Sequence, residues 1–301
     1  MKILKNETID YLTANFVEDE TLWLISSVFD YADEVRFGHF IYKYAGESGT
    51  NTINNPQADS LLFSPTWVEI APTNYYSMLD GRTNTQTENA DTIIIEIQSI
   101  NYDSISLLGI EAISVKIELI ETATSIIQYT KEFNLNDTTS FIDAFTYYFS
   151  EFELSPSIYE DMIPLYNDAK LRITIDNTGG IAKCGRLVFG RSYYVGDTKY
   201  GGKLTQESYS RKEVDEFGNE TLVQLGSVNL DSYEVQIPTA KIPSLRRKGA
   251  DLDAIAILFI MDESADSKLE NLLNFGYWYD FSMVLSNPVK SKISLTIKGI
   301  L

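Results

Sequence analysis

The sequence has 301 residues, of which 44% are hydrophobic, and 43 acidic against 24 basic residues give a net charge of −19. This composition excludes an intrinsically disordered chain, and the length allows one large core or two smaller ones. The negative charge also excludes nucleic acid and an anionic membrane surface as favourable partners.

The N-terminus and the single cysteine indicate where the chain is made. Residues 1–7 lack the apolar core of a signal peptide, and no apolar run approaches the roughly 18 residues of a membrane span. We therefore expect a chain that is made in a cytoplasm and does not insert into a membrane. Cys184 has no partner for a disulfide and lies in an apolar run, which predicts a buried core residue.

The N-terminal part of the chain divides into an arm and a small domain. Residues 1–20 are a polar, acidic lead with a short amphipathic stretch, which predicts an arm. Residues 21–80 hold three short β-like runs and a polar loop at 46–59, bracketed by Trp23 and Trp67. This pattern predicts a small three-stranded aromatic module. A polar stretch at 80–90 predicts the boundary to a second domain at 81–301.

The second domain shows the two-residue period of half-buried strands. Apolar and polar residues alternate over 113–120, 171–176 and 293–298, which is typical of antiparallel strands. Further strands are predicted at 91–97, 125–133, 141–152, 186–194, 222–229, 254–261 and 278–285. Breakers at 101–103, 177–180 and 215–219 separate them. Short helices are predicted at 243–248 and 266–274. The fold class is therefore all-β, with the small module followed by an antiparallel sandwich of jelly-roll type.

Two resemblances add to this pattern. The order Trp23, Tyr31-Ala-Asp33-Glu-Val35, Phe40-Ile41-Tyr42, Pro56 and Trp67 resembles the small chitin-binding-type carbohydrate-binding modules. This chain departs from them because Asp33-Glu34 stands where they have Gly-Asp, and because its loop before Trp67 is longer. Over residues 20 to 300 the chain more closely resembles a group of tailed-bacteriophage virion proteins. The segments that carry this likeness are 73–80, 185–190, 196–201 and 209–219.

The second resemblance implies a structural protein of a phage tail, neck, collar or appendage, without catalytic residues or cofactors. It implies a location in the virion, several copies of the chain, and neighbouring virion proteins as partners. We expect the N-terminal module to be the adaptor. The alternative function is a non-catalytic protein that binds glycans on the host surface, and a third is a glycan-degrading enzyme. The 43 acidic residues make close carboxylate pairs inevitable, so they favour no hydrolase.

The aromatic residues of the module are the candidates for glycan or partner binding. They are Trp23, Tyr31, Tyr42, Tyr44 and Trp67. Aromatic faces stack on sugar rings, but a unit this small also needs its large side chains for its own core. We expect Trp23 and Trp67 to be core residues and Tyr42 and Tyr44 to be the more open ones.

Two further segments are candidates for docking a neighbouring subunit. Residues 209–219 predict a hairpin whose turn is at Gly218-Asn219, with Tyr209, Arg211, Lys212 and Phe217 as possible anchors. Arg246, Arg247 and Lys248 form the one basic cluster. They could meet the acidic N-terminal region of another copy, where residues 1–80 hold twelve acidic against four basic residues.

No motif of a known reaction or metal site is present. His39 is the only histidine and has no nucleophile elbow to accompany it, so we expect an ordinary surface residue. The spacing of a calcium loop, a phosphate-binding loop or a zinc site does not occur.

Overall fold

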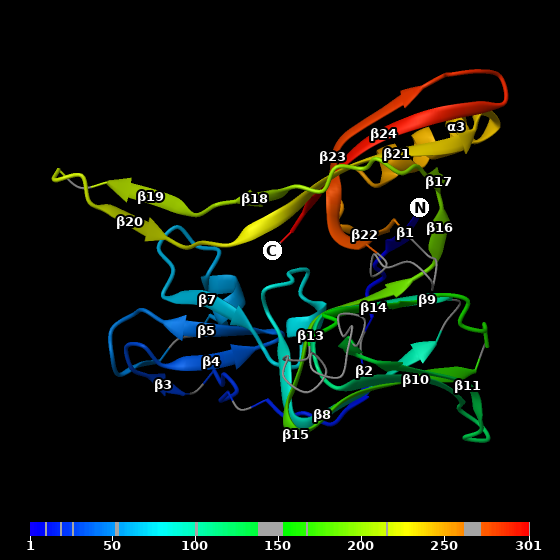
Figure 1. The fold of residues 1–301 in the computed structure, drawn as a ribbon. Coiled ribbons are helices and arrows are strands. Elements are labelled where there is room, and N and C mark those ends of the chain that lie inside the picture. The colour runs from blue at the N-terminus through cyan, green and yellow to red at the C-terminus, as the bar shows by residue number, and fades with distance from the viewer. Residues whose placement is uncertain are drawn as a thin grey trace, which may run out of the picture.

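The structure is a computed structural model that describes residues 1–9, 11–18, 20–25, 27–51, 54–99, 102–137, 153–166, 168–214, 216–261 and 272–300. Strands dominate it, and all the paired strands are antiparallel, which confirms the all-β sandwich class. Figure 1 shows the N-terminal module beside a sandwich, and an upper sheet above the sandwich. A long hairpin leaves the upper sheet.

The sandwich is one seven-stranded sheet folded into two layers. The first layer has the order β11 (Ile127–Asn134), β10 (Ser114–Glu121), β15 (Ala169–Gly190), β8 (Thr87–Ser99) and β2 (Tyr11–Ala14). The second layer contains β14 (Ser157–Glu160), β9 (Ser104–Glu111) and the second half of β15. Isoleucine, leucine and valine side chains from both layers fill the core between them.

Strand β15 joins the two layers. Its first half pairs with β10 and β8, and its second half pairs with β9 and the start of β8. The sequence predicted two strands separated by a break at 177–180. The structure has one strand of 22 residues with a register shift between Asp176 and Ile181, so this prediction was wrong. Gly179 has a φ of 88°, and the segment therefore bends the strand instead of ending it.

The upper sheet has eight strands and receives both ends of the chain. Its order is β16 (Ser192–Tyr194), β1 (Lys2–Lys5), β22 (Ile257–Ile260), β23 (Leu273–Val284), β24 (Lys290–Gly299), β21 (Ser227–Pro238) and β17 (Asp197–Thr198), and β18 (Gln206–Ser208) also pairs with β21. Helix α3 (Ile242–Asp251), which follows η2 (Thr239–Lys241), packs Leu245 against one face. The other face packs on the sandwich through Leu4, Leu258 and Phe275.

Residues 1–20, which we expected to form an arm, are built into both sheets. β1 lies between β16 and β22, and β2 forms an edge of the sandwich beside β8. The buried amino group of Met1 donates a hydrogen bond to the carbonyl of Gly196 at 2.7 Å. The amphipathic stretch therefore covers apolar surface of its own chain.

The module contains a three-stranded sheet, as predicted. This sheet has the order β4 (Glu34–Phe37), β5 (Phe40–Tyr44) and β7 (Trp67–Pro72). Beside it lie the pair β3 (Val28–Phe29) and β6 (Thr50–Asn51) and the short helix α1 (Pro56–Asp59). η1 (Ser77–Leu79) follows β7 and buries Met78 in the sandwich core.

The remaining predictions concern short elements. The helix predicted at 243–248 is α3. Of the helix predicted at 266–274, residues 266–271 lie outside the described residues. Residues 273 and 274 begin strand β23 instead. The strand predicted at 141–152 also lies outside the described residues, next to the small pair β12 (Asn136–Asp137) and β13 (Glu153–Leu154). Within the described part of the chain, no helix is long and apolar enough to cross a membrane.

Arg186 of β15 links three parts of the fold. Its guanidinium carbon lies 4.5 Å from the ring centre of Phe275 in the upper sheet. Its Nη1 lies 3.9 Å from the carboxylate of Asp80, the last residue of the module. Both side chains are almost fully buried, and burial lowers the pKa of Arg186 while Asp80 opposes that shift. The segments 73–80 and 185–190, which carry the phage resemblance, therefore meet through an ion pair.

We predict that Asp80→Ala lowers the free energy of unfolding by about 3–5 kcal/mol, because it leaves the buried guanidinium without its counter-charge. Chemical denaturation would measure this. The control is Asp280→Ala, an exposed acid that should change stability by about 0.5 kcal/mol or less. The double variant Asp80→Ala with Arg186→Met should recover part of the loss. A single-variant cost as small as the control's would contradict the role of the pair.

Candidate interaction surfaces

The aromatic residues of the module form its own core. Tyr42, Tyr44 and Trp67 are buried together with Phe29 and Val35. The ring centres of Tyr44 and Trp67 are 4.9 Å apart, as are those of Phe29 and Trp67. The alternation along β5 places both tyrosines on the same face of the sheet, toward Trp67.

A buried carboxylate holds the start of β7 in place. Asp59, at the end of α1, accepts hydrogen bonds from the backbone N–H of Thr66 at 2.6 Å and of Trp67 at 2.9 Å. It also accepts one from the Thr66 hydroxyl at 2.9 Å. These bonds satisfy a carboxylate that would otherwise be costly to bury. The polar loop before Trp67 therefore contributes to the position of that tryptophan.

The aromatic residues that a sugar-stacking platform would use are mostly buried. We expected Tyr42 and Tyr44 to be the more open ones, but each is only 1% exposed, and Trp67 is fully buried. Trp23 is half-buried and packs edge-on against Phe37. Only Tyr31 of the five candidates is exposed, at 69%. A unit this small needs its few large side chains for its own core, and these aromatic residues pack on one another.

An exposed apolar loop of the module was not anticipated. Leu61, Leu62 and Phe63 follow α1 in sequence, and all three side chains are exposed. Three consecutive exposed apolar residues are unusual on a surface that contacts only water. The sequence carried the signal in the run Leu-Leu-Phe between two serines.

The hairpin predicted at 209–219 is present. β19 (Arg211–Val214) pairs with β20 (Glu220–Val223), and Gly218 in the turn has a φ of 85°. The two strands pair only with each other within the described part of the chain, and the hairpin projects from the end of β18 and β21 (Figure 1).

The four hairpin candidates lie at different points along it. Arg211 and Lys212 are exposed on β19, and Lys212 forms an ion pair with Glu220 at 2.5 Å. Phe217 is 90% exposed at the tip. Tyr209 lies at the base, where Lys298 is 5.6 Å from its ring centre.

The basic cluster occupies the outer side of α3. Leu245 anchors the helix in the core, and Arg246, Arg247 and Lys248 are exposed. Lys248 lies 4.1 Å from the ring centre of Tyr193. No carboxylate of a described residue forms an ion pair with any of the three cations, whereas several other lysine and arginine residues in the described part of the chain have such a pair.

The titratable candidates for chemistry lie apart from one another. His39 is exposed, as expected, and stacks on Tyr76 with ring centres 4.3 Å apart. Cys184 is buried, as expected, and burial raises the pKa of its thiol to about 12. Among the described residues, no group of three histidine, cysteine or acidic side chains could hold a metal ion.

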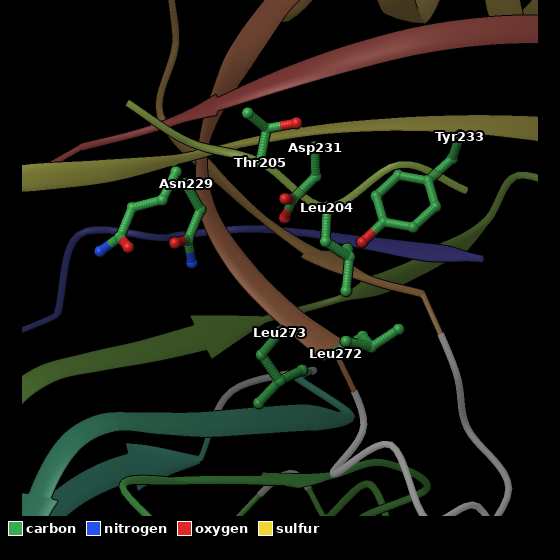
Figure 2. Close-up of a pocket in the computed structure, with 8 residues that line it drawn as sticks. Leu204, Thr205, Asn229, Asp231, Tyr233, Leu272 and Leu273 are labelled. Carbon is green, nitrogen blue, oxygen red and sulfur yellow. The ribbon is translucent and has the colours of Figure 1, made fainter. Parts of the chain in front are cut away.

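A cavity of about 360 Å³ lies beside β21, where sequence reasoning found no site. Figure 2 shows Asn229, Asp231 and Tyr233 along this strand, with leucine side chains opposite. The signal was the two-residue spacing of Asn229, Asp231 and Tyr233, which places them on one face of a strand.

No protein-family model and no curated protein matches this sequence significantly.

We predict that Tyr42→Ala lowers the free energy of unfolding by about 3–5 kcal/mol, because it empties a fully packed aromatic site. Denaturation followed by tryptophan fluorescence would measure this. Tyr31→Ala is the matched control on the exposed tyrosine and should change stability by about 0.5 kcal/mol or less. Equal stability of the two variants would mean that Tyr42 is not a core residue.

Proposed function

We propose that this chain is a structural, non-enzymatic component of a tailed-phage virion, located in the tail, neck, collar or an appendage. It assembles with further copies of itself and with neighbouring virion proteins. The virion assignment rests on the sequence resemblance. The observation that carries the assembly role is the projecting β19–β20 hairpin.

The hairpin supports this role because a two-stranded ribbon is only marginally stable alone in water. All four residues of β19 are exposed, and so are three of the four residues of β20. The hairpin and the segment after it nevertheless carry large apolar side chains that no described part of the chain covers, namely those of Val214, Leu222 and Leu225. Packing against another subunit would bury these side chains and stabilise the ribbon.

The two faces of the hairpin differ in a way that suits docking. In the register of the pair, Lys212 is opposite Leu222 and Val214 is opposite Glu220. Because residues two apart share a face, both apolar side chains lie on the face that carries the Lys212–Glu220 ion pair. The apolar residues would supply the buried centre of an interface, and the ion pair would supply its polar rim.

The module and α3 provide further contact points for an assembly. Leu61, Leu62 and Phe63 are an apolar anchor on the module, in keeping with an adaptor role. The cations of α3 would meet an acidic surface of another copy or of a neighbour. Such a pairing fixes the register of subunits more than it adds affinity.

We predict that Val214→Ser with Leu222→Ser weakens self-association at least tenfold, because each substitution removes apolar area from the proposed interface. Light scattering over a concentration series would measure the oligomer and its dissociation. Both side chains are exposed in the single chain, so its thermal unfolding should be unchanged. Val289→Ser is the matched control, since Val289 is equally exposed on the β23–β24 connection. A monomeric wild type, or an oligomer insensitive to the double variant, would contradict self-association through the hairpin.

The virion assignment has its own test. Gold-labelled antibody against this chain should mark the neck, tail or an appendage of intact phage particles from its source. An antibody against a known tail protein serves as the positive control. Particles that bind the control antibody but not this one would show that the chain is not a virion part.

A further inference from the structure

We propose that the cavity beside β21 binds a primary ammonium group on an unbranched alkyl stem, such as a lysine side chain, with Asp231 as the counter-charge. The cavity volume of about 360 Å³ lies within the range of small-ligand sites. The proposal does not depend on the virion assignment.

Strand β21 sets the chemistry of the cavity. Tyr233, Val235 and Ile237 share one face of the strand and pack in the core under α3. Two and four residues before Tyr233, the same face carries Asp231 and Asn229. The cavity therefore lies where the apolar face of the upper sheet becomes polar (Figure 2).

Asp231 is held in place by a residue of β23, which lies two strands away from β21 in the sheet. The Asn274 side chain of β23 donates a hydrogen bond to Asp231 Oδ2 at 2.8 Å, and both residues are buried. Strand β24 lies between them, and a Cβ at Gly299 would come within 3.2 Å of Asn274 Oδ1. The glycine thus leaves Asn274 the room it needs to reach Asp231.

The Asp231 carboxylate has no cationic partner among the residues that the structure describes. No described residue forms an ion pair with Asp231, and Lys298, on the neighbouring strand, is bound instead to Glu207 at 2.7 Å. Burial raises the pKa of Asp231, and the bonds from Asn274 and the Thr205 backbone only partly offset this. A buried carboxylate without a cation is costly for the fold, and a cationic ligand would remove that cost.

The other walls fit the rest of an alkylammonium group. The Tyr233 hydroxyl and the Asn229 side-chain oxygen can accept hydrogen bonds from the ammonium N–H groups that do not bond to Asp231. Neither makes a hydrogen bond with a described residue. Leu204, Leu272 and Leu273 form an apolar wall that would cover a methylene stem. A neutral polyol would leave the buried charge without a partner, which favours the ammonium ligand.

The test is binding of n-butylammonium to the full chain, followed by saturation-transfer NMR and calorimetry. n-Butanol is the matched ligand without the charge. We expect n-butylammonium to bind and n-butanol to bind at least tenfold more weakly, since hydrogen bonds to a charged group are stronger than those between neutral groups. A short lysine-containing peptide, compared with free n-butylammonium, distinguishes a protein side chain from a free amine as the source of the group.

Two variants locate the site. Asp231→Asn keeps the shape and an acceptor for Asn274 but removes the charge, and it should weaken binding about tenfold to a hundredfold. Asn229→Ala alters an exposed residue at the cavity rim and should weaken binding severalfold, whereas Gln224→Ala, an exposed residue outside the cavity, should have no effect. Thermal unfolding of each variant shows whether it is folded.

Several outcomes would overturn the proposal. One is the absence of n-butylammonium binding to the wild type. Another is binding that both Asp231→Asn and Asn229→Ala leave unchanged, which would place the ligand elsewhere. Binding of glucose or of Ca²⁺ at this site in preference to n-butylammonium would show that the cavity recognises a different chemistry.

Discussion

The fold depends on β15 being one bent strand. Because this strand pairs with β10 in one layer and with β9 in the other, the two layers of the sandwich are covalently continuous and share one hydrogen-bonded ladder. The bend at 177–180 lies between the half that pairs with β10 and the half that pairs with β9. From Cys184 onward its residues are buried, with one face toward the sandwich core and one toward the upper sheet. A substitution in this strand therefore affects the packing of both layers of the sandwich and of the upper sheet.

Polar contacts fix how these layers meet. Apolar packing between sheets is largely non-directional, whereas the Arg186 guanidinium has a defined direction toward Asp80 and the Phe275 ring. The ion pair ties the end of the module to the second half of β15. On the other side, the amino group of Met1 and strand β1 tie the N-terminus into the upper sheet. Rigid connections of this kind suit a protein whose proposed task is to hold interfaces in a fixed geometry without disulfides.

The large aromatic and apolar residues divide between core and surface in a way that bears on function. The module uses Trp67, Tyr42 and Tyr44 for its own stability, and it exposes Leu61, Leu62 and Phe63 instead. The hairpin similarly carries leucine and valine side chains into solvent. These exposed groups lie on a loop and on a projecting ribbon, where they are available to another chain without disturbing a core. The cavity beside β21 is different, because its central group is a buried charge and its neighbours are positioned by the upper sheet.

The sequence by itself determined the local features, because these depend on near neighbours. The alternation of β10 and β24 predicted antiparallel strands, and Gly218 predicted the turn of the β19–β20 hairpin. Only the tertiary structure decided which contacts form between distant segments. The glycines at 179 and 180 indicate a break or a bend equally well, and pairing with β8 and β9 on either side makes it a bend. Tyr42 and Tyr44 fit a sugar platform or a core, and packing on Trp67 makes them core. Asp231 and Asn274 are 43 positions apart, and they meet only because β23, β24 and β21 lie side by side with a glycine between the two side chains.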